Sequence, residues 1–224
     1  MSARETIFNS IRQALNVTGE ESPRRMAVDD RLARAPQGVI PTRGQGDASA
    51  RLETFKSEAA RAQASIAEVA RFDDTPGEIV KYLRDNNLPA TLRMGEDKRL
   101  AAMPWSDTLV EISQGASDGH DLNGVSAAFA AVAETGTLAL ASGADNPTTL
   151  NFLPDNHIVV LAASDIAGDY ESVWARLRAA YGKGAMPRTL NFITGPSRSA
   201  DIEQTLLLGA HGPRRLHIVI VKGA

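Results

Sequence analysis

Residues 194–213 carry the densest group of side chains in this sequence that could do chemistry. The segment TGPSRSADIE begins at Thr194, and LLLGAHGP follows and ends at Pro213. Both pieces lie between apolar runs at residues 190–193 and 216–221, which is typical of loops at strand ends. Hydroxyl groups, a guanidinium group and a flexible backbone in one loop suit a site that holds an anion. The candidate anion-binding residues are Thr194, Gly195, Ser197, Arg198, Ser199 and Asp201.

A helix that began near Ser199 would present free backbone N–H groups to a carboxylate or phosphate, and Arg198 would add positive charge. An alternative stays open, in which Ser199 only caps that helix and Asp201 only complements its dipole. Capping accounts for Ser199 and Asp201, but it accounts for neither Arg198 nor the Gly-Pro turn.

A second candidate group is the segment ETGT at residues 134–137. It follows an alanine-rich stretch that we interpret as a buried helix. A buried carboxylate must be hydrogen-bonded or paired, so Glu134 either opens into a polar cavity or pairs with Arg198 or a histidine. The alternative is an acid that locks the turn at Gly136 through backbone N–H groups. We therefore take Glu134 as a candidate catalytic residue, and Thr135, Gly136 and Thr137 as candidate substrate-binding residues.

The sequence has four histidines, and one of them lies in the candidate loop. His211 has a glycine on either side of the Ala-His pair, which suits general acid or base catalysis, although it could equally hold the turn. We interpret His157 and His217 as structural because they begin or interrupt apolar runs, and we expect His120 to be exposed. No pair has the spacing of a metal motif, and neither GxGxxG nor a Walker A sequence is present. We therefore predict no metal site.

The amino-acid composition excludes some kinds of chemistry for this chain. The 224 residues include no cysteine, so the chain cannot form a disulfide or ligate an iron-sulfur cluster through cysteine sulfur. Any redox chemistry would then belong to a bound cofactor or a partner. The net charge of -3, with acids and bases interspersed, gives no reason to expect nucleic-acid binding. The sequence shows neither a signal-peptide core nor a run of roughly 20 apolar residues, so we expect a cytoplasmic protein with no membrane span.

The elements that must position the candidate residues alternate between helices and strands. Apolar spacing predicts helices at residues 48–64, 75–87, 97–103, 121–134 and 170–181. Short apolar runs predict strands at residues 65–70, 91–94, 108–112, 138–141, 157–163, 190–194 and 216–221. Short connections around residues 138–141, 206–208 and 216–221 favour some antiparallel pairing. The pattern predicts an α/β domain with a mainly parallel, partly mixed sheet flanked by helices.

Ahead of a domain at residues 48–224, residues 1–47 are predicted to form a helix and an extended arm. Ser2 can cap a short helix whose apolar stripe is Ile7, Ile11 and Leu15. Residues 19–46 are charged and rich in proline, glycine and arginine, which predicts an extended segment. This arm is either a solvated linker, or it wraps a neighbouring subunit and so makes a homo-oligomer.

The motifs resemble those of the lactate utilization protein C family, the small single-domain members of the LUD domain group. The resemblance is carried by AETGTL at residues 133–138, by the approach to a strand at residues 154–157, by TGPSRSADIE at residues 194–203 and by LGAHGP at residues 208–213. One departure is Ser199, where many relatives have threonine, and the hydroxyl is kept.

The resemblance implies a fold related to the ribose-isomerase, glucosamine-phosphate isomerase and CoA-transferase superfamily. It also implies a non-cluster component of a bacterial system that oxidises L-lactate to pyruvate, with iron-sulfur subunits as partners and no cluster in this chain. As an enzyme, the chain would act as a subunit of an L-lactate dehydrogenase complex. The alternative is a freestanding isomerase-like or transferase-like enzyme for a sugar phosphate or acyl-CoA, which would use Glu134 as base or nucleophile.

Overall fold

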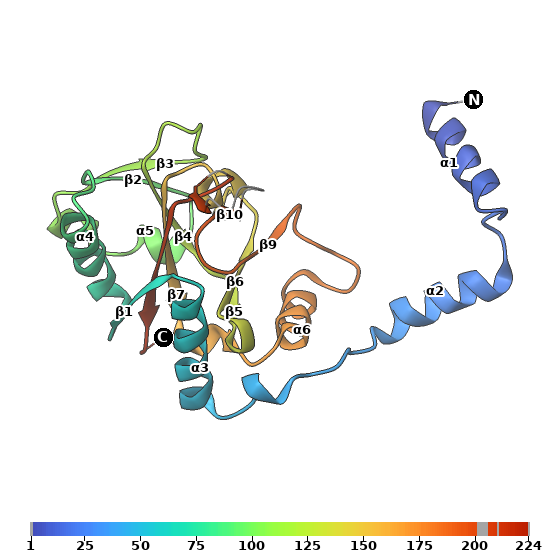
Figure 1. The fold of residues 1–224 in the computed structure, drawn as a ribbon, viewed down its shortest axis with the longest axis horizontal. Coiled ribbons are helices and arrows are strands. Elements are labelled where there is room, and N and C mark those ends of the chain that lie inside the picture. Colours follow the sequence, from blue (N-terminus) through green and yellow to red (C-terminus); the bar gives the residue numbers. More distant parts are fainter. Residues whose placement is uncertain (1, 201–205, 210, 224) are drawn as a thin grey trace. The chain divides into compact units, whose positions relative to one another are not determined.

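The computed structural model describes residues 2–200, 206–209 and 211–223, whose fold is drawn in Figure 1. The chain divides into two compact units, Met1–Val39 and Ile40–Ala224. The division into an arm at residues 1–47 and a domain at residues 48–224 stays a prediction. Within the described ranges, no helix is long and apolar enough to cross a membrane.

The first unit contains two helices, α1 (Ala3–Ala14) and α2 (Ser22–Arg34). The capped helix is confirmed, because the Ser2 hydroxyl accepts a hydrogen bond from the Glu5 N–H and the Glu5 carboxylate accepts one from the Ser2 N–H. The extended conformation predicted for residues 19–46 is wrong over α2. Pro23 stands in the first turn of α2, where proline favours a helix, and good helix formers follow it.

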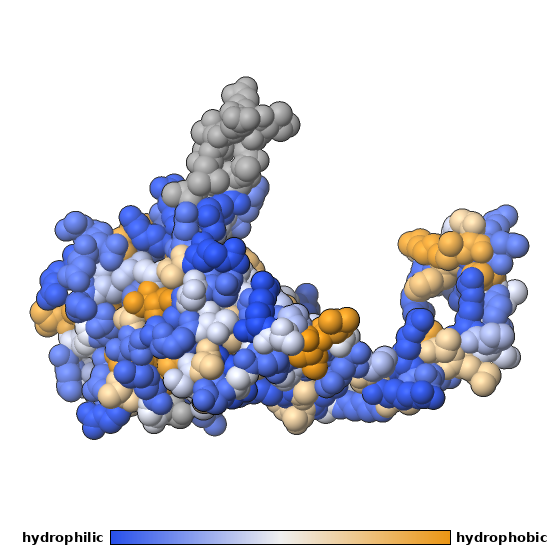
Figure 2. Space-filling model, turned by 60° about the horizontal axis from the view of Figure 1, so that its bottom comes forward, coloured by the Kyte–Doolittle hydropathy of each residue, from blue (hydrophilic) through white to orange (hydrophobic). Residues whose placement is uncertain are grey.

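Both helices leave apolar side chains exposed, and Figure 2 shows hydrophobic surface gathered on this unit. These side chains include Ile7, Phe8, Ile11 and Leu15 of the first helical stretch and Met26, Val28 and Leu32 of the second. The homo-oligomer, one of the two alternatives for the arm, stays a prediction.

The second unit is built on a six-stranded sheet with the order β1-β12-β7-β4-β2-β3, in which every neighbouring pair is parallel. Its strands are β1 (Ser65–Val69), β2 (Thr91–Met94), β3 (Glu111–Gln114), β4 (Asn123–Ala127), β7 (Asn156–Ala162) and β12 (Arg215–Val221). The mainly parallel sheet is therefore confirmed. The antiparallel pairing expected around residues 216–221 is wrong, because β12 is parallel to both of its neighbours.

A four-stranded sheet, with the order β8-β5-β6-β9, supplies the antiparallel part. Its strands are β5 (Ala130–Val132), β6 (Thr137–Ala141), β8 (Ile166–Ala167) and β9 (Leu190–Ile193). The strand β6 is antiparallel to β5 and to β9. The short strands β10 (Arg198–Ala200) and β11 (Leu206–Leu208) form an antiparallel ribbon. Antiparallel pairing at residues 138–141 and 206–208 is confirmed.

Helices cover these sheets in layers: α3 (Ala48–Arg61), α4 (Thr75–Asp85), α5 (Lys98–Ala101) and α6 (Tyr170–Tyr181). Alternate side chains of β7 point to opposite faces of the large sheet. Ile158 and Val160 pack in one core with α4 and α5, whereas Val159 and Leu161 pack in a second core with α3 and the small sheet. The far face of the small sheet packs against α6 through Val173.

The helix predicted at residues 121–134 is wrong. This segment forms β4, β5 and the short 3₁₀ turn η4 (Ala133–Thr135). All five residues of β4 are buried, and so are all three residues of β5. The apolar residues at steps of three and four are separated by alanine, glycine and serine, which are small enough to be buried too. A strand buried on both faces shows no alternation, so spacing alone could not identify it.

Candidate functional site

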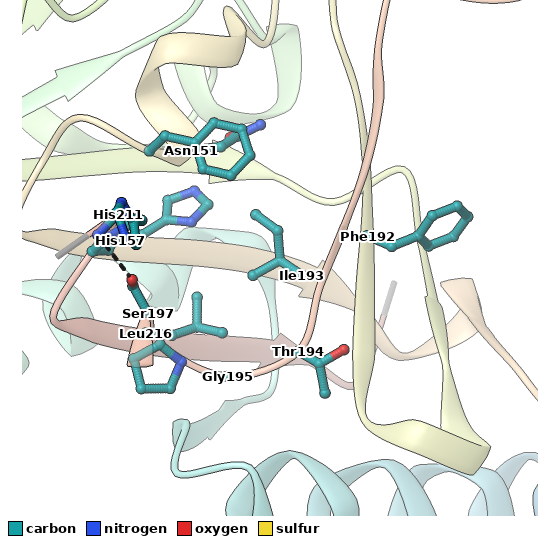
Figure 3. A pocket seen from close by; sticks show the side chains of 13 residues that line it. Asn151, His157, Phe192, Ile193, Thr194, Gly195, Ser197, His211 and Leu216 are labelled. Atoms are coloured by element: carbon teal, nitrogen blue, oxygen red, sulfur yellow. Dashed lines mark hydrogen bonds between the residues drawn. The ribbon is translucent and has the colours of Figure 1, made fainter. Parts of the chain in front are cut away.

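A cavity of about 250 Å³ lies beside the loop that follows β9, and Figure 3 shows its lining. It lies at the amino ends of β7 and β12, where His157 and Leu216 are the second residues of their strands. The cavity thus adjoins the loop singled out from the sequence, which follows β9, a strand that pairs antiparallel with β6.

Some of the predicted residues line this cavity and others do not. Those in the lining are Thr194, Gly195, Ser197 and His211. Those outside it are Glu134, Thr135, Gly136, Thr137 and Arg198. Asp201 lies outside the described residues. The helix considered near Ser199 does not begin at that residue, because residues 198–200 form β10 and pair with β11.

Backbone hydrogen bonds hold the two ends of the β10–β11 ribbon together at the cavity. The Ser197 N–H donates to the Pro213 carbonyl at 2.8 Å, and the Gly209 N–H donates to the Ser197 carbonyl at 3.1 Å. The His211 N–H donates to Ser197 Oγ at 3.4 Å, as drawn in Figure 3. The main chain at His211 thus holds the turn, while its exposed side chain lines the cavity.

Four hydroxyl groups connect the ETGT motif to the cavity loop. Thr137 Oγ1 lies 2.7 Å from Thr135 Oγ1, 3.0 Å from the Tyr170 hydroxyl and 2.6 Å from Thr194 Oγ1. Thr137 is fully buried, whereas Thr194 is exposed and lines the cavity. The two motifs singled out in the sequence therefore meet through the Thr137–Thr194 contact.

Replacing Thr137 with valine should destabilise the fold by about 1–3 kcal/mol, because the fully buried Thr137 hydroxyl is removed and three other hydroxyl groups lose a shared partner. Urea unfolding followed by circular dichroism measures this free energy. Tyr170→Phe removes two hydroxyl contacts but keeps the Thr137–Thr194 bond, so its effect should be smaller. Equal unfolding midpoints for Thr137→Val and the unmodified protein would contradict this account.

Glu134 lies apart from the cavity lining and is buried, with 4% of its surface exposed. Its N–H donates to the Gly168 carbonyl at 3.2 Å, while its Oε2 has no hydrogen-bond partner among the described residues. Arg198 instead donates to the Ala62 carbonyl at 3.0 Å. In the described part of the chain, Glu134 forms no ion pair with Arg198 or with a histidine. Its catalytic role stays a prediction.

Two glycines of the predicted site press against the C-terminal end of α3. Gly136 has φ +64°, and a Cβ there would lie 2.2 Å from the Ala59 nitrogen. Gly195 has φ +73°, and a Cβ there would lie 2.1 Å from the Ala62 carbonyl oxygen. Both positions therefore require glycine for packing, whatever else they do.

Sequence reasoning missed three polar residues at the site. Ser126, Asn151 and His157 are each 1% exposed, and Asn151 and His157 line the cavity. Burial lowers the pKa of His157 to about 3, so its imidazole is neutral near pH 7. His157 is buried within a strand, in agreement with its interpretation as structural, and it also lines the cavity. Its position at the start of an apolar strand, directly after the polar segment that holds Asn151, was the available signal.

Two histidines, His217 and His120, do not line the cavity. His217 is buried and stacks on Tyr82, with ring centroids 3.9 Å apart. Burial, together with the charge of Lys81, lowers the pKa of His217 to about 4. His120 is exposed, as predicted. Across the described ranges, no group of three or more acidic or histidine side chains could hold a metal ion.

The site lies in a part of the chain that matches a known protein family. A family model for the LUD domain matches residues 122–221, which include β4, the cavity loop and β12. A lactate utilization protein C from an Exiguobacterium species is 30% identical over 182 residues, covering 76% of this chain and 77% of that protein. A protein of the same name from a Geobacillus species is 41% identical over 91 residues, and the chain spans only 38% of its length.

A solved structure supports the fold. The crystal structure of a DUF162 family protein from Deinococcus radiodurans superposes with a TM-score of 0.58 at 22% identity, covering 79% of this chain and 99% of that chain. Together with the Exiguobacterium match, which extends over three quarters of both sequences, the resemblance read from the motifs is confirmed. The chain belongs to the lactate utilization protein C family and carries a LUD domain.

Proposed function

We propose that this protein is a non-cluster component of an iron-sulfur system that oxidises L-lactate to pyruvate, and that it binds a small organic acid in the cavity beside Thr194. The names of its relatives support the lactate-utilization role. The single observation that carries the binding role is a small, part-polar cavity whose lining includes two buried polar side chains, Asn151 and His157.

The size of the cavity favours a small ligand. Its volume of about 250 Å³ is below the roughly 300–1,000 Å³ of clefts that hold drug-sized ligands. An acyl-CoA would extend far beyond it. Among the described residues, the lining has no aspartate or glutamate side chain to repel an anion, and Thr194, Ser197 and Asn151 offer polar groups to a carboxylate. The alternative enzyme would rely on Glu134, which does not line the cavity, so no observation favours it.

Electron transfer would belong to partner subunits. Oxidation of L-lactate to pyruvate releases two electrons and two protons, and a chain without cysteine cannot hold an iron-sulfur cluster through thiolates. We therefore assign the clusters to partners that receive the electrons. A strain that lacks this gene, and has no second copy, should fail to grow on L-lactate but grow normally on glucose. Normal growth on L-lactate would contradict the proposed role.

Isothermal titration calorimetry of the full chain with L-lactate tests the binding role. We expect saturable binding to the unmodified protein, and at least tenfold weaker binding to Asn151→Leu, which keeps the side-chain volume but removes the amide. Asn146→Leu is the matched control, because Asn146 is also a buried asparagine but lies outside the cavity lining. If both variants keep the circular dichroism spectrum of the fold and bind equally, the cavity is not the binding site.

A further inference from the structure

Three buried side chains form a hydrogen-bonded chain at the cavity. The Ser126 hydroxyl lies 3.2 Å from Asn151 Oδ1 and 3.1 Å from His157 Nε2. Ser126 belongs to β4 and His157 to the neighbouring strand β7, while Asn151 ends the 3₁₀ turn η5 (Thr148–Asn151). All three are 1% exposed, so water does not compete for these bonds.

The direction of each bond follows from the number of protons available. Asn151 Oδ1 can only accept, so the Ser126 hydroxyl donates its single proton to it. The Ser126 oxygen must then accept the second bond, which makes His157 Nε2 the donor. Because burial keeps this imidazole neutral, it carries one ring proton. His157 Nδ1 is therefore the unprotonated nitrogen, with a lone pair.

This arrangement leaves one hydrogen-bond acceptor and one hydrogen-bond donor available to a ligand. His157 Nδ1 can accept a hydrogen bond and Asn151 Nδ2 can donate, and neither atom has a partner in the part of the chain that the structure describes. Figure 3 shows both side chains among the cavity lining. Buried polar groups without partners are unfavourable, so a ligand that satisfies both atoms binds with an advantage.

We propose that the Ser126–Asn151–His157 chain makes the cavity select a 2-hydroxy acid over the corresponding 2-oxo acid. The ligand hydroxyl donates to His157 Nδ1, and its carboxylate accepts from Asn151 Nδ2. A 2-oxo acid offers only acceptor oxygens, so its keto group would bring a second lone pair against His157 Nδ1. The inference rests on the proposed function and deepens it, because the cavity would hold L-lactate and release pyruvate.

Calorimetric titration of the full chain with L-lactate, pyruvate and propionate measures this selectivity. Propionate keeps the carboxylate but lacks the hydroxyl. A site built to pair a ligand hydroxyl rejects analogues that lack it, so we expect L-lactate to bind at least tenfold more tightly than either. Equal affinities, or tighter binding of pyruvate, would overturn the selectivity and leave the proposed function standing. Failure of all three acids to bind would overturn both.

Ser126 acts as a positioning residue, because it fixes which ring nitrogen of His157 carries the proton. Ser126→Ala should bring the ratio of L-lactate to pyruvate affinity toward one. The matched control is Ser65→Ala, since the Ser65 hydroxyl bonds His217 Nδ1 at 2.9 Å in the same way but outside the cavity lining. It should leave the ratio unchanged. An unchanged ratio in Ser126→Ala would overturn the role of the chain.

A measurement without ligand tests the proton position directly. Long-range proton–nitrogen correlation spectra of protein labelled with ¹⁵N-histidine distinguish protonated from unprotonated ring nitrogens, and His157→Gln assigns the signals of His157. We expect an unprotonated Nδ1 in the unmodified protein. A protonated Nδ1 would show the reverse polarity of the chain and would overturn the inference.

Discussion

Replacing Gly136 with alanine is expected to destabilise the protein by about 3 kcal/mol or more. A non-glycine residue at φ +64° is strained by roughly 1–3 kcal/mol. The added Cβ would also lie 2.2 Å from the Ala59 nitrogen, so α3 or the β5–β6 turn must move, and overpacking of this kind costs about 1–3 kcal/mol. The free energy of unfolding in urea, measured by circular dichroism, gives the total.

A second glycine separates the two contributions. Gly184 has φ +78°, close to that of Gly136, but a Cβ there would meet no atom within 4 Å. Gly184→Ala should therefore show the backbone strain alone, and should be less destabilised than Gly136→Ala by the overpacking contribution. Equal losses of stability in the two variants would mean that α3 does not press on the turn.

Stability should fall steeply as the pH is lowered from 7 to 5, because two buried histidines are neutral in the folded protein. Burial lowers the pKa of His157 to about 3 and that of His217 to about 4, whereas an unfolded histidine has a pKa of about 6.5. Below about pH 6.5 the unfolded chain binds protons that the folded chain does not, so acid favours unfolding. The expected loss is about 4 kcal/mol between pH 7 and pH 5.

Urea unfolding at a series of pH values measures this slope. Carboxylates whose pKa is lowered in the fold, such as Glu68, act in the same direction but titrate below this range. His217→Phe keeps a ring to stack on Tyr82 and removes one titrating group, so it should reduce the slope by about half. His120→Gln changes an exposed histidine and should leave the slope as it is. A slope in His217→Phe equal to that of the unmodified protein would refute the assignment.

Elements whose apolar residues recur at a regular spacing could be predicted from the sequence. The amphipathic helix at residues 170–181 is α6, with the predicted bounds, and the apolar runs beginning at residues 157 and 216 are strands. Residues 121–134 were not predictable in this way. Their alanines, glycine and serine fit a helix or a strand equally well, and only pairing of β4 with β2 and β7, which are distant in sequence, decides between them.

The candidate site, too, could be predicted from the sequence only in part. Thr194, Ser197 and His211 were identified because glycine, proline and polar side chains in one loop are a local signal. Ser126 and Asn151 have no such signal. The parallel register that sets Gly124 opposite His157 brings Ser126 within reach of the imidazole. Ser126 and His157 are 31 residues apart in the sequence, so a local sequence pattern cannot predict their contact.

The close approach of α3 to Gly136 and Gly195 bears on how distant relatives of this protein can be recognised. Backbone atoms of Ala59 and Ala62, at the C-terminal end of α3, leave no room for a Cβ at either glycine. A relative that kept α3 in this place would have to keep both glycines even after its substrate had changed. A sequence search for these two glycines would therefore find proteins that share the fold by descent. Relatives with a different substrate would instead differ at Ser126, Asn151 and His157.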